Sequence, residues 1–218
     1  MISMQKQKIV PLGKDMTYID AFFATKEKGG LPANALHDDT LQSNTLLEHI
    51  KKTFGLGSGY SFYGAWAREI IAYPEENGVF AKGEIKDHAY DWVLPAKYVP
   101  KSAIGKKGIA LVITPKNLII ANGKTTVIPQ GKVIVQSFPQ TDGLYDYDRR
   151  TRIPLDAEPK GEGFWDARYL YRWDEQSLRP VSRWYGFDGD GRRLVYGWGP
   201  DLRLGVGVVE PQAKHAKK

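Results

Sequence analysis

Large aromatic side chains and arginines dominate residues 164–198, where short apolar runs alternate with turns rich in glycine and aspartate. Aromatic residues are enriched in strands, and closely spaced turn signals favour short antiparallel strands. Tryptophan, tyrosine and arginine also dominate the energetic centres of binding surfaces. This stretch therefore predicts β-structure and, at the same time, a candidate binding surface.

We predict that the binding surface is an aromatic–arginine face of this β-structure. Across a turn at residues 174–180, the spacing predicts that Trp173 and Trp184 lie on neighbouring strands. A second turn, rich in glycine and aspartate, is predicted at residues 188–191. The predicted binding residues are Trp173, Arg179, Arg183, Trp184, Arg192, Arg193 and Trp198.

Residues 185–195 are similar to a single tyrosine–aspartate repeat of the kind found in β-cocoon shells. Those proteins carry many tandem copies, whereas one convincing copy is present in this chain. The similarity therefore predicts a hairpin at these residues, and it does not assign the chain to a family.

The middle of the chain, residues 67–139, continues the β pattern. Asn77 with Gly78 and Asn122 with Gly123 are typical of type I′ hairpin turns, and residues 129–131 indicate another tight turn. The apolar runs between these turns are short and close together. Antiparallel pairing is expected, because parallel crossovers need a dozen or more residues.

Helical signals are concentrated in residues 1–66. Asp15 is predicted to cap a helix that runs through Phe23, and Ser43 to precede a second helix that Gly55 ends. The buried stripe of the second helix is predicted to be Leu46, Leu47, Ile50 and Phe54. Residues 62–73 fit either a helix or a turn that leads into a strand.

These patterns predict an α+β fold in which a small helical region packs beside a mostly antiparallel β body. The predicted segments are a helical region (1–66), a β subdomain (67–139), a linker (140–163), an aromatic and arginine-rich β subdomain (164–210) and a tail (211–218). The β body is either one curled sheet system or sandwich, or two partly open barrels joined by the linker. The sequence does not distinguish between these two arrangements.

Composition excludes several classes of chemistry. The chain has 218 residues and no cysteine, so disulfides, thiolate metal sites and cysteine nucleophiles are excluded. No apolar run is long enough for a membrane span or a secretory signal, so we expect a soluble, cytoplasmic protein without a membrane partner. The net charge of +6 allows an acidic partner, but basic and acidic residues are expected to be interspersed along most of the chain.

Histidine meets carboxylates in two places, His37 with Asp38 and Asp39, and His88 with Asp87 and Asp91. A catalytic metal needs about three protein ligands on rigid elements. Adjacent residues seldom point at one ion, so no metal and no cofactor are predicted. A metal- or carboxylate-dependent hydrolase that uses His37, Asp38 and Asp39, or His88, is the enzymatic alternative.

The sequence therefore favours a non-enzymatic binding or assembly protein. Its expected partner is another protein or further copies of the chain. A nucleic-acid-binding module, in which arginine and tyrosine residues follow a phosphate backbone, is the third hypothesis.

Overall fold

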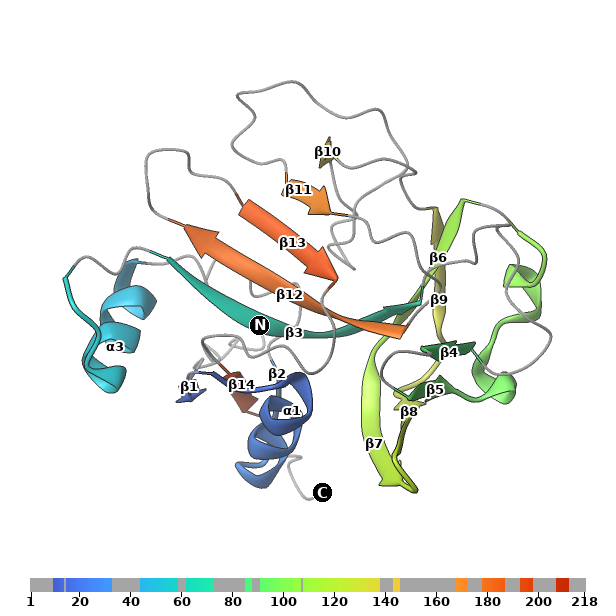
Figure 1. The fold of residues 1–218 in the computed structure, drawn as a ribbon, viewed down its shortest axis with the longest axis horizontal. Helices are drawn as coiled ribbons and strands as arrows, with labels where there is room; N and C mark the ends of the chain where they lie inside the picture. The colour runs from blue at the N-terminus through green and yellow to red at the C-terminus, as the bar shows by residue number, and fades with distance from the viewer. Residues whose placement is uncertain are drawn as a thin grey trace, which may run out of the picture.

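Within the residues that the structure describes, two α-helices and three β-sheets form the predicted α+β fold (Figure 1). The structure is a computed structural model. It describes residues 10–13, 15–32, 44–58, 62–72, 85–87, 91–106, 108–137, 143–145, 168–171, 178–186, 193–197 and 207–211. The helices are α1 (Tyr18–Glu27) and α3 (Asn44–Phe54), with two short 3₁₀ helices, η2 (Ala96–Tyr98) and η3 (Lys101–Ala103).

The largest sheet has seven strands and unites both predicted β subdomains. Its order is β10 (Gly143–Tyr145), β11 (Arg168–Tyr171), β13 (Arg193–Gly197), β12 (Leu178–Gly186), β3 (Phe62–Ala72), β6 (Ile109–Ile113) and β9 (Ile134–Ser137). The two halves meet where β12 pairs antiparallel with β3. One sheet system therefore replaces the alternative of two barrels, although the segment boundaries themselves stay a prediction.

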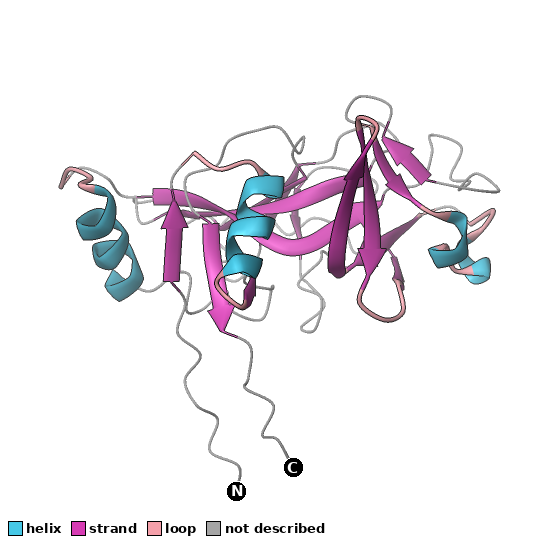
Figure 2. Ribbon diagram, turned by 90° about the horizontal axis from the view of Figure 1, so that it is seen from below, coloured by secondary structure: helices cyan, strands magenta, loops and turns pink. Residues whose placement is uncertain are grey.

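Two smaller sheets complete the fold. A four-stranded sheet has the order β4 (Ile85–Asp87), β5 (Trp92–Leu94), β8 (Lys124–Pro129) and β7 (Pro115–Ala121). A three-stranded sheet has the order β1 (Val10–Gly13), β14 (Gly207–Pro211) and β2 (Gly30–Pro32). Figure 2 shows α1 between the three-stranded sheet and the β7–β8 hairpin.

A long bent hairpin joins the two larger sheets. Strand β6 continues through Thr114 into β7, and β8 continues into β9, so each arm starts in one sheet and ends in the other. The backbone N–H of Gln130 donates to the Thr114 carbonyl oxygen at 2.7 Å and keeps the arms together at the bend. The predicted turn at residues 129–131 is therefore wrong: the chain kinks there, with Gly131 at a φ of 83°, and does not reverse.

The tip of this hairpin is the turn that the sequence predicts. Asn122 and Gly123 have φ values of 52° and 73°, and Ala121 pairs with Lys124 across them. Positive φ at both central positions is the type I′ geometry, which asparagine and glycine tolerate. The corresponding prediction for Asn77 and Gly78 falls on residues outside the described ranges.

The cap of helix α1 lies two residues later than the predicted cap at Asp15. Thr17 is the N-cap, and its side chain accepts a hydrogen bond from the Asp20 backbone N–H, while the Asp20 carboxylate accepts from the Thr17 backbone N–H. This reciprocal pair satisfies two N–H groups that a helix start leaves without partners. With this start, Tyr18 is the first buried residue of the helix.

Helix α3 follows Ser43 and ends before Gly55, as predicted. Gly55 has a φ of 63°, and the Leu56 N–H donates to the Lys51 carbonyl oxygen at 2.9 Å. This is the bond of a Schellman cap, which requires the left-handed conformation that glycine adopts without strain. Ile50 of the predicted stripe is fully buried.

The ambiguous segment after α3 is entirely a strand, β3. Residues 65–72 are buried without interruption, so the strand is covered on both faces. A strand of this kind has no polar–apolar alternation and resembles a buried helix in sequence. The segment is a strand because it pairs with β12 and β6, which lie far away in the chain.

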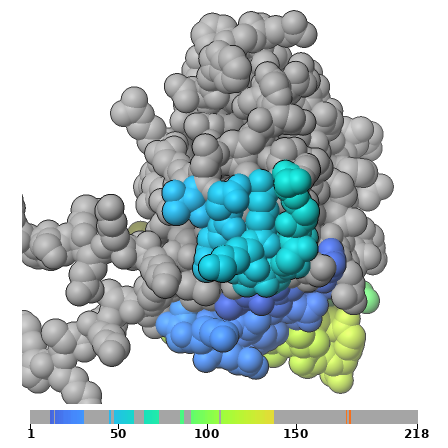
Figure 3. Space-filling view, turned by 90° about the vertical axis from the view of Figure 1, so that its left-hand side faces the viewer, coloured from blue at the N-terminus to red at the C-terminus, as the bar shows by residue number. Residues whose placement is uncertain are grey.

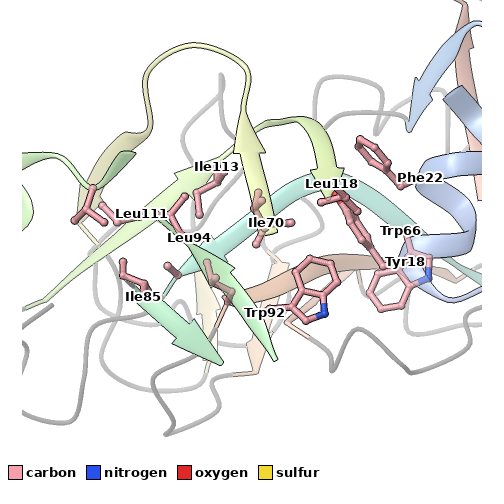
Figure 4. Close-up of a cluster of buried hydrophobic side chains, with 14 of the residues drawn as sticks. Tyr18, Phe22, Trp66, Ile70, Ile85, Trp92, Leu94, Leu111, Ile113 and Leu118 are labelled. Carbon is pink, nitrogen blue, oxygen red and sulfur yellow. The ribbon is translucent and has the colours of Figure 1, made fainter. Parts of the chain in front are cut away.

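Tyr18 is the centre of the aromatic core (Figure 4). Its ring lies 5.7 Å from Trp66 of β3 and 5.7 Å from Trp92 of β5, both in edge-on contact, and 6.2 Å from Phe22. The Tyr18 hydroxyl donates to the Arg68 carbonyl oxygen at 2.8 Å, and the Trp66 indole N–H donates to the Met16 carbonyl oxygen at 2.9 Å. One helix is thereby fixed to both larger sheets.

Replacing Tyr18 with phenylalanine removes the donor to the Arg68 carbonyl oxygen and keeps the ring. We expect the free energy of unfolding to fall by about 1–3 kcal/mol, because a buried acceptor loses its partner. Urea unfolding followed by tryptophan fluorescence measures the change. Tyr98→Phe is the control, since Tyr98 is only half-buried, and it should change stability by less than about 0.5 kcal/mol. Equal losses in the two variants would contradict the assignment.

Tyr18 also predicts a loss of stability in alkali. Burial raises the pKa of its hydroxyl well above the usual value; the charge of Glu69 adds to this effect, and that of Arg68 opposes it. The unfolded chain loses this proton near about pH 10, whereas the folded state keeps it. Stability is therefore fully present below about pH 10 and falls above it. Between about pH 9 and pH 11, the urea midpoint should fall more for the wild type than for Tyr18→Phe; parallel falls would disprove this.

Candidate binding surfaces

The predicted binding residues are distributed over strands β12 and β13 and their connections. Arg179, Arg183 and Trp184 lie in β12, and Arg193 begins β13. Trp173, Arg192 and Trp198 fall outside the residues that the structure describes, as does the turn at residues 188–191. The antiparallel pairing of β12 with β13 across that turn agrees with the predicted hairpin.

The other predicted hairpin, across residues 174–180, is wrong. Strand β11 precedes this segment and β12 follows it, but β13 lies between the two strands in the sheet. Strand β11 pairs with β13 in parallel instead. The sequence could not show this arrangement, because β13 enters the sheet from a later part of the chain.

The register divides the predicted aromatic–arginine face. Successive positions of a strand belong to opposite faces of a sheet. The position of Trp184 pairs with Gly64 and Leu194, on the face that carries the buried Trp66. The neighbouring position, Arg183, pairs with Ala65 and Val195 and belongs to the opposite face.

Four arginine positions share this opposite face, and we call them the arginine face. Arg179 and Arg183 lie four residues apart in β12, and Arg193 lies two residues before Val195 in β13. Arg168 of β11 pairs directly with Arg193. At β3 this side of the sheet is buried, since Ala65, Ala67 and Ile71 are covered. A binding surface on this face must therefore lie toward β13 and β11.

A second basic surface was missed by the sequence prediction, which expected basic and acidic residues to be interspersed. Residues 92–141 contain seven lysines and no aspartate, glutamate or arginine. Removing these seven from the 31 basic residues leaves 24 against 25 acidic residues, so the net charge of +6 comes entirely from this segment. The lysines are Lys97, Lys101, Lys106, Lys107, Lys116, Lys124 and Lys132. The absence of acidic residues from residues 92–141 is the feature of the sequence that indicates this basic surface.

This segment folds into β5 to β9, and its described lysines are all exposed. Within the described part of the chain, none of them forms an ion pair. Two isoleucines near the hairpin tip are also exposed, Ile119 by 48% and Ile120 by 54%. The β7–β8 hairpin therefore combines free positive charge with accessible apolar side chains.

Two contacts fix the position of this hairpin. At the bend, a guanidinium nitrogen of the buried Arg68 donates to the Gln130 side-chain oxygen. On β7, the Lys26 ammonium of α1 donates to the Asn117 side-chain oxygen. Figure 3 shows α1, in blue, directly beside the yellow-green hairpin. These contacts connect the hairpin to β3 and to α1.

Both candidate histidine clusters involve residues outside the described ranges, namely His37 with Asp38 and Asp39, and His88. Asp87 ends β4 and Asp91 is exposed beside it. No group of three or more metal-binding side chains occurs among the residues described. The metal- or carboxylate-dependent hydrolase stays a hypothesis.

Comparison with protein-family models, with curated proteins and with solved structures found no match to this chain. No helix in the described residues is long and apolar enough to cross a membrane.

Gln130→Ala tests the contact at the base of the hairpin. The buried Arg68 guanidinium loses a charge-assisted hydrogen bond, so we expect the free energy of unfolding to fall by about 1.5–3 kcal/mol. Lys132→Ala, in the same bend but exposed, is the control and should cost less than about 0.5 kcal/mol. Denaturant unfolding measures both variants. A Gln130→Ala protein as stable as the wild type would show that the contact does not stabilise the bend.

Proposed function

We propose that this protein is a non-enzymatic binding or assembly protein that holds a protein partner, or a further copy of itself, on the arginine face. The observation that carries the proposal is the register, which gathers the positions of Arg168, Arg179, Arg183 and Arg193 on one side of the seven-stranded sheet. Arginine is enriched at binding hot spots, because its planar guanidinium forms paired hydrogen bonds and stacks on aromatic rings.

The division of the sheet into two faces gives different roles to neighbouring residues of β12. The position of Trp184 shares its face with Trp66, whose ring packs in the core, so a structural role is expected for Trp184. The position of Arg183 belongs to the other face and is expected to contribute to binding. The proposed binding surface therefore consists of arginines, and the aromatic residues are expected to pack on the opposite face of the sheet.

The rival class is the hydrolase built on His37, Asp38 and Asp39, or on His88. It predicts that a change at these histidines abolishes an activity while partner binding is kept. The binding proposal predicts instead that a change in the arginine face weakens partner binding, and that a change at these histidines does not.

Two variants test the proposal. The arginine variant combines Arg183→Ala with Arg193→Ala, and the second variant is Trp184→Ala. The arginine variant should keep its stability within about 1 kcal/mol and weaken binding by about 2 kcal/mol or more. Trp184→Ala should lose about 3–5 kcal/mol of stability, as expected for a core aromatic residue. Binding is measured as particle mass in sedimentation velocity, and as retention of one specific protein by the tagged chain at high salt.

Two results would overturn this proposal. One is an arginine variant with unchanged particle mass and unchanged partner retention. The other is a Trp184→Ala protein of wild-type stability that no longer binds, because the aromatic side of β12 would then be the binding side.

A further inference from the structure

Strand β7 is the outer strand of the four-stranded sheet. Among the described strands it pairs with β8 alone, while β8 is also paired with β5 on its other side. One face of the hairpin is held in the core through the buried Leu118 and Val127. The end of β7 is nevertheless accessible, because Ile119 is exposed by 48% and Ile120 by 54%. An accessible outer strand is a template on which another strand can pair.

The backbone groups of Ile120 face this outer edge. The Thr125 backbone N–H donates to the Asp91 carbonyl oxygen at 3.0 Å, on the side of β8 that adjoins β5. Opposite residues of an antiparallel pair exchange both of their hydrogen bonds or neither. Ile120 is opposite Thr125, so its own N–H and carbonyl oxygen point away from β8. At Ile119, opposite Thr126, the alternation of the ladder directs these groups toward β8 instead.

An added strand meets an apolar side chain on each face of the sheet. Successive side chains of a strand point to opposite faces, so Ile119 and Ile120 lie on either side of the edge. Contacts between apolar side chains on neighbouring strands stabilise their pairing. The edge therefore favours an extended segment with apolar residues at its centre.

The charge around the edge is positive. Lys116 is exposed at one end of β7, and Lys124 is exposed just beyond the turn at the other end. The Lys26 ammonium of α1 reaches the Asn117 side chain on β7. The exposed Asp91 lies beyond β8, next to β5, rather than at this edge. Acidic residues at the two ends of an added strand would complement this arrangement.

A second copy of the chain does not match the edge. Pairing of β7 with β7 of another copy would bring the same lysines from both chains together. Like charges on paired strands destabilise a sheet, and lysines on outer strands are a means by which proteins prevent self-pairing. The charge thus excludes a copy of this chain and favours an acidic segment of another protein.

We propose that β7 binds an extended segment of a partner protein as an additional strand, with apolar residues against Ile119 and Ile120 and acidic residues toward Lys116 and Lys124. Main-chain hydrogen bonds to Ile120 supply affinity and the flanking side chains supply specificity, as in other complexes formed by strand addition. The edge belongs to the four-stranded sheet and the arginine face to the seven-stranded sheet, so this inference goes beyond the function proposed above.

Amide hydrogen exchange of the full chain, followed by NMR, tests the direction of the backbone groups. In the free protein the Ile120 amide should exchange faster than the Ile119 amide, because only Ile119 is directed toward β8. The probe is the acetylated peptide Glu-Asp-Val-Ile-Val-Asp-Glu. At saturation it should slow exchange at Ile120 by about tenfold or more and change Ile119 little.

Fluorescence anisotropy with the same peptide, labelled, tests the selection. It should bind about tenfold more tightly than Lys-Lys-Val-Ile-Val-Lys-Lys. Lys116→Gln with Lys124→Gln should weaken binding of the acidic peptide about fivefold. Ile120→Pro should abolish binding, because proline removes the outward N–H and takes no hydrogen bond from β8.

A change in the peptide gives the same test without changing the protein. Alternate N–H groups of an added strand point toward β7 and away from it. Peptides that are N-methylated at the central isoleucine or at both valines therefore differ: one should lose binding and the other should keep it.

Matched controls separate the edge from general charge. Lys52→Gln with Lys101→Gln removes the same charge from exposed positions on α3 and η3 and should keep the affinity within about twofold. The arginine variant should bind the peptide like the wild type, so failure of either proposal can be recognised separately. Circular dichroism and the urea midpoint show whether each variant is folded.

The proposal is wrong if the acidic peptide does not bind at about 1 mM, or if the acidic and basic peptides bind equally. It is also wrong if the bound peptide leaves exchange at Ile120 unchanged, or if both N-methylated peptides bind like the parent. Loss of peptide binding in the arginine variant, with binding kept by a folded Ile120→Pro protein, would assign the peptide to the arginine face. A particle mass that falls in Ile120→Pro without peptide would assign the edge to a second copy and overturn the proposal.

Discussion

The contacts of Tyr18 hold the fold together, since one buried ring touches a tryptophan from each of the two larger sheets. Trp66 belongs to the seven-stranded sheet and Trp92 to the four-stranded sheet, and both meet the Tyr18 ring at 5.7 Å. Edge-on aromatic contacts of this kind contribute beyond the area that they bury. The Thr17 cap fixes where α1 begins, and thereby aims Tyr18 into the core.

The bent hairpin couples the sheets in a second way, because its arms run through both of them. The arms bend at Thr114 and Gln130. On one side of the bend they form β6 and β9 at the edge of the seven-stranded sheet, and on the other side they form β7 and β8 of the four-stranded sheet. The buried Arg68 lies at this bend, and its backbone carbonyl accepts the Tyr18 hydroxyl. The aromatic core and the β7–β8 hairpin are therefore linked through one residue.

The two basic residue types occupy different parts of the molecule, and their chemistry differs accordingly. Arginine positions gather on β11, β12 and β13, where planar guanidinium groups suit protein surfaces. The lysines of residues 92–141 that the structure describes lie instead in β7, in β8 and in the connections between β5 and β9.

Local chemistry along the sequence determined the α+β class, the Schellman end at Gly55 and the turn at Asn122 and Gly123, because each depends on neighbouring residues alone. Tertiary structure decided the rest. β3 carries no alternation because it is buried on both faces, so only its partners β12 and β6 reveal it as a strand. Likewise, Arg183 and Trp184 are adjacent in sequence, but pairing with Ala65 and Gly64 assigns them to opposite faces. Register joins residues more than a hundred positions apart, and no local pattern encodes such a pairing.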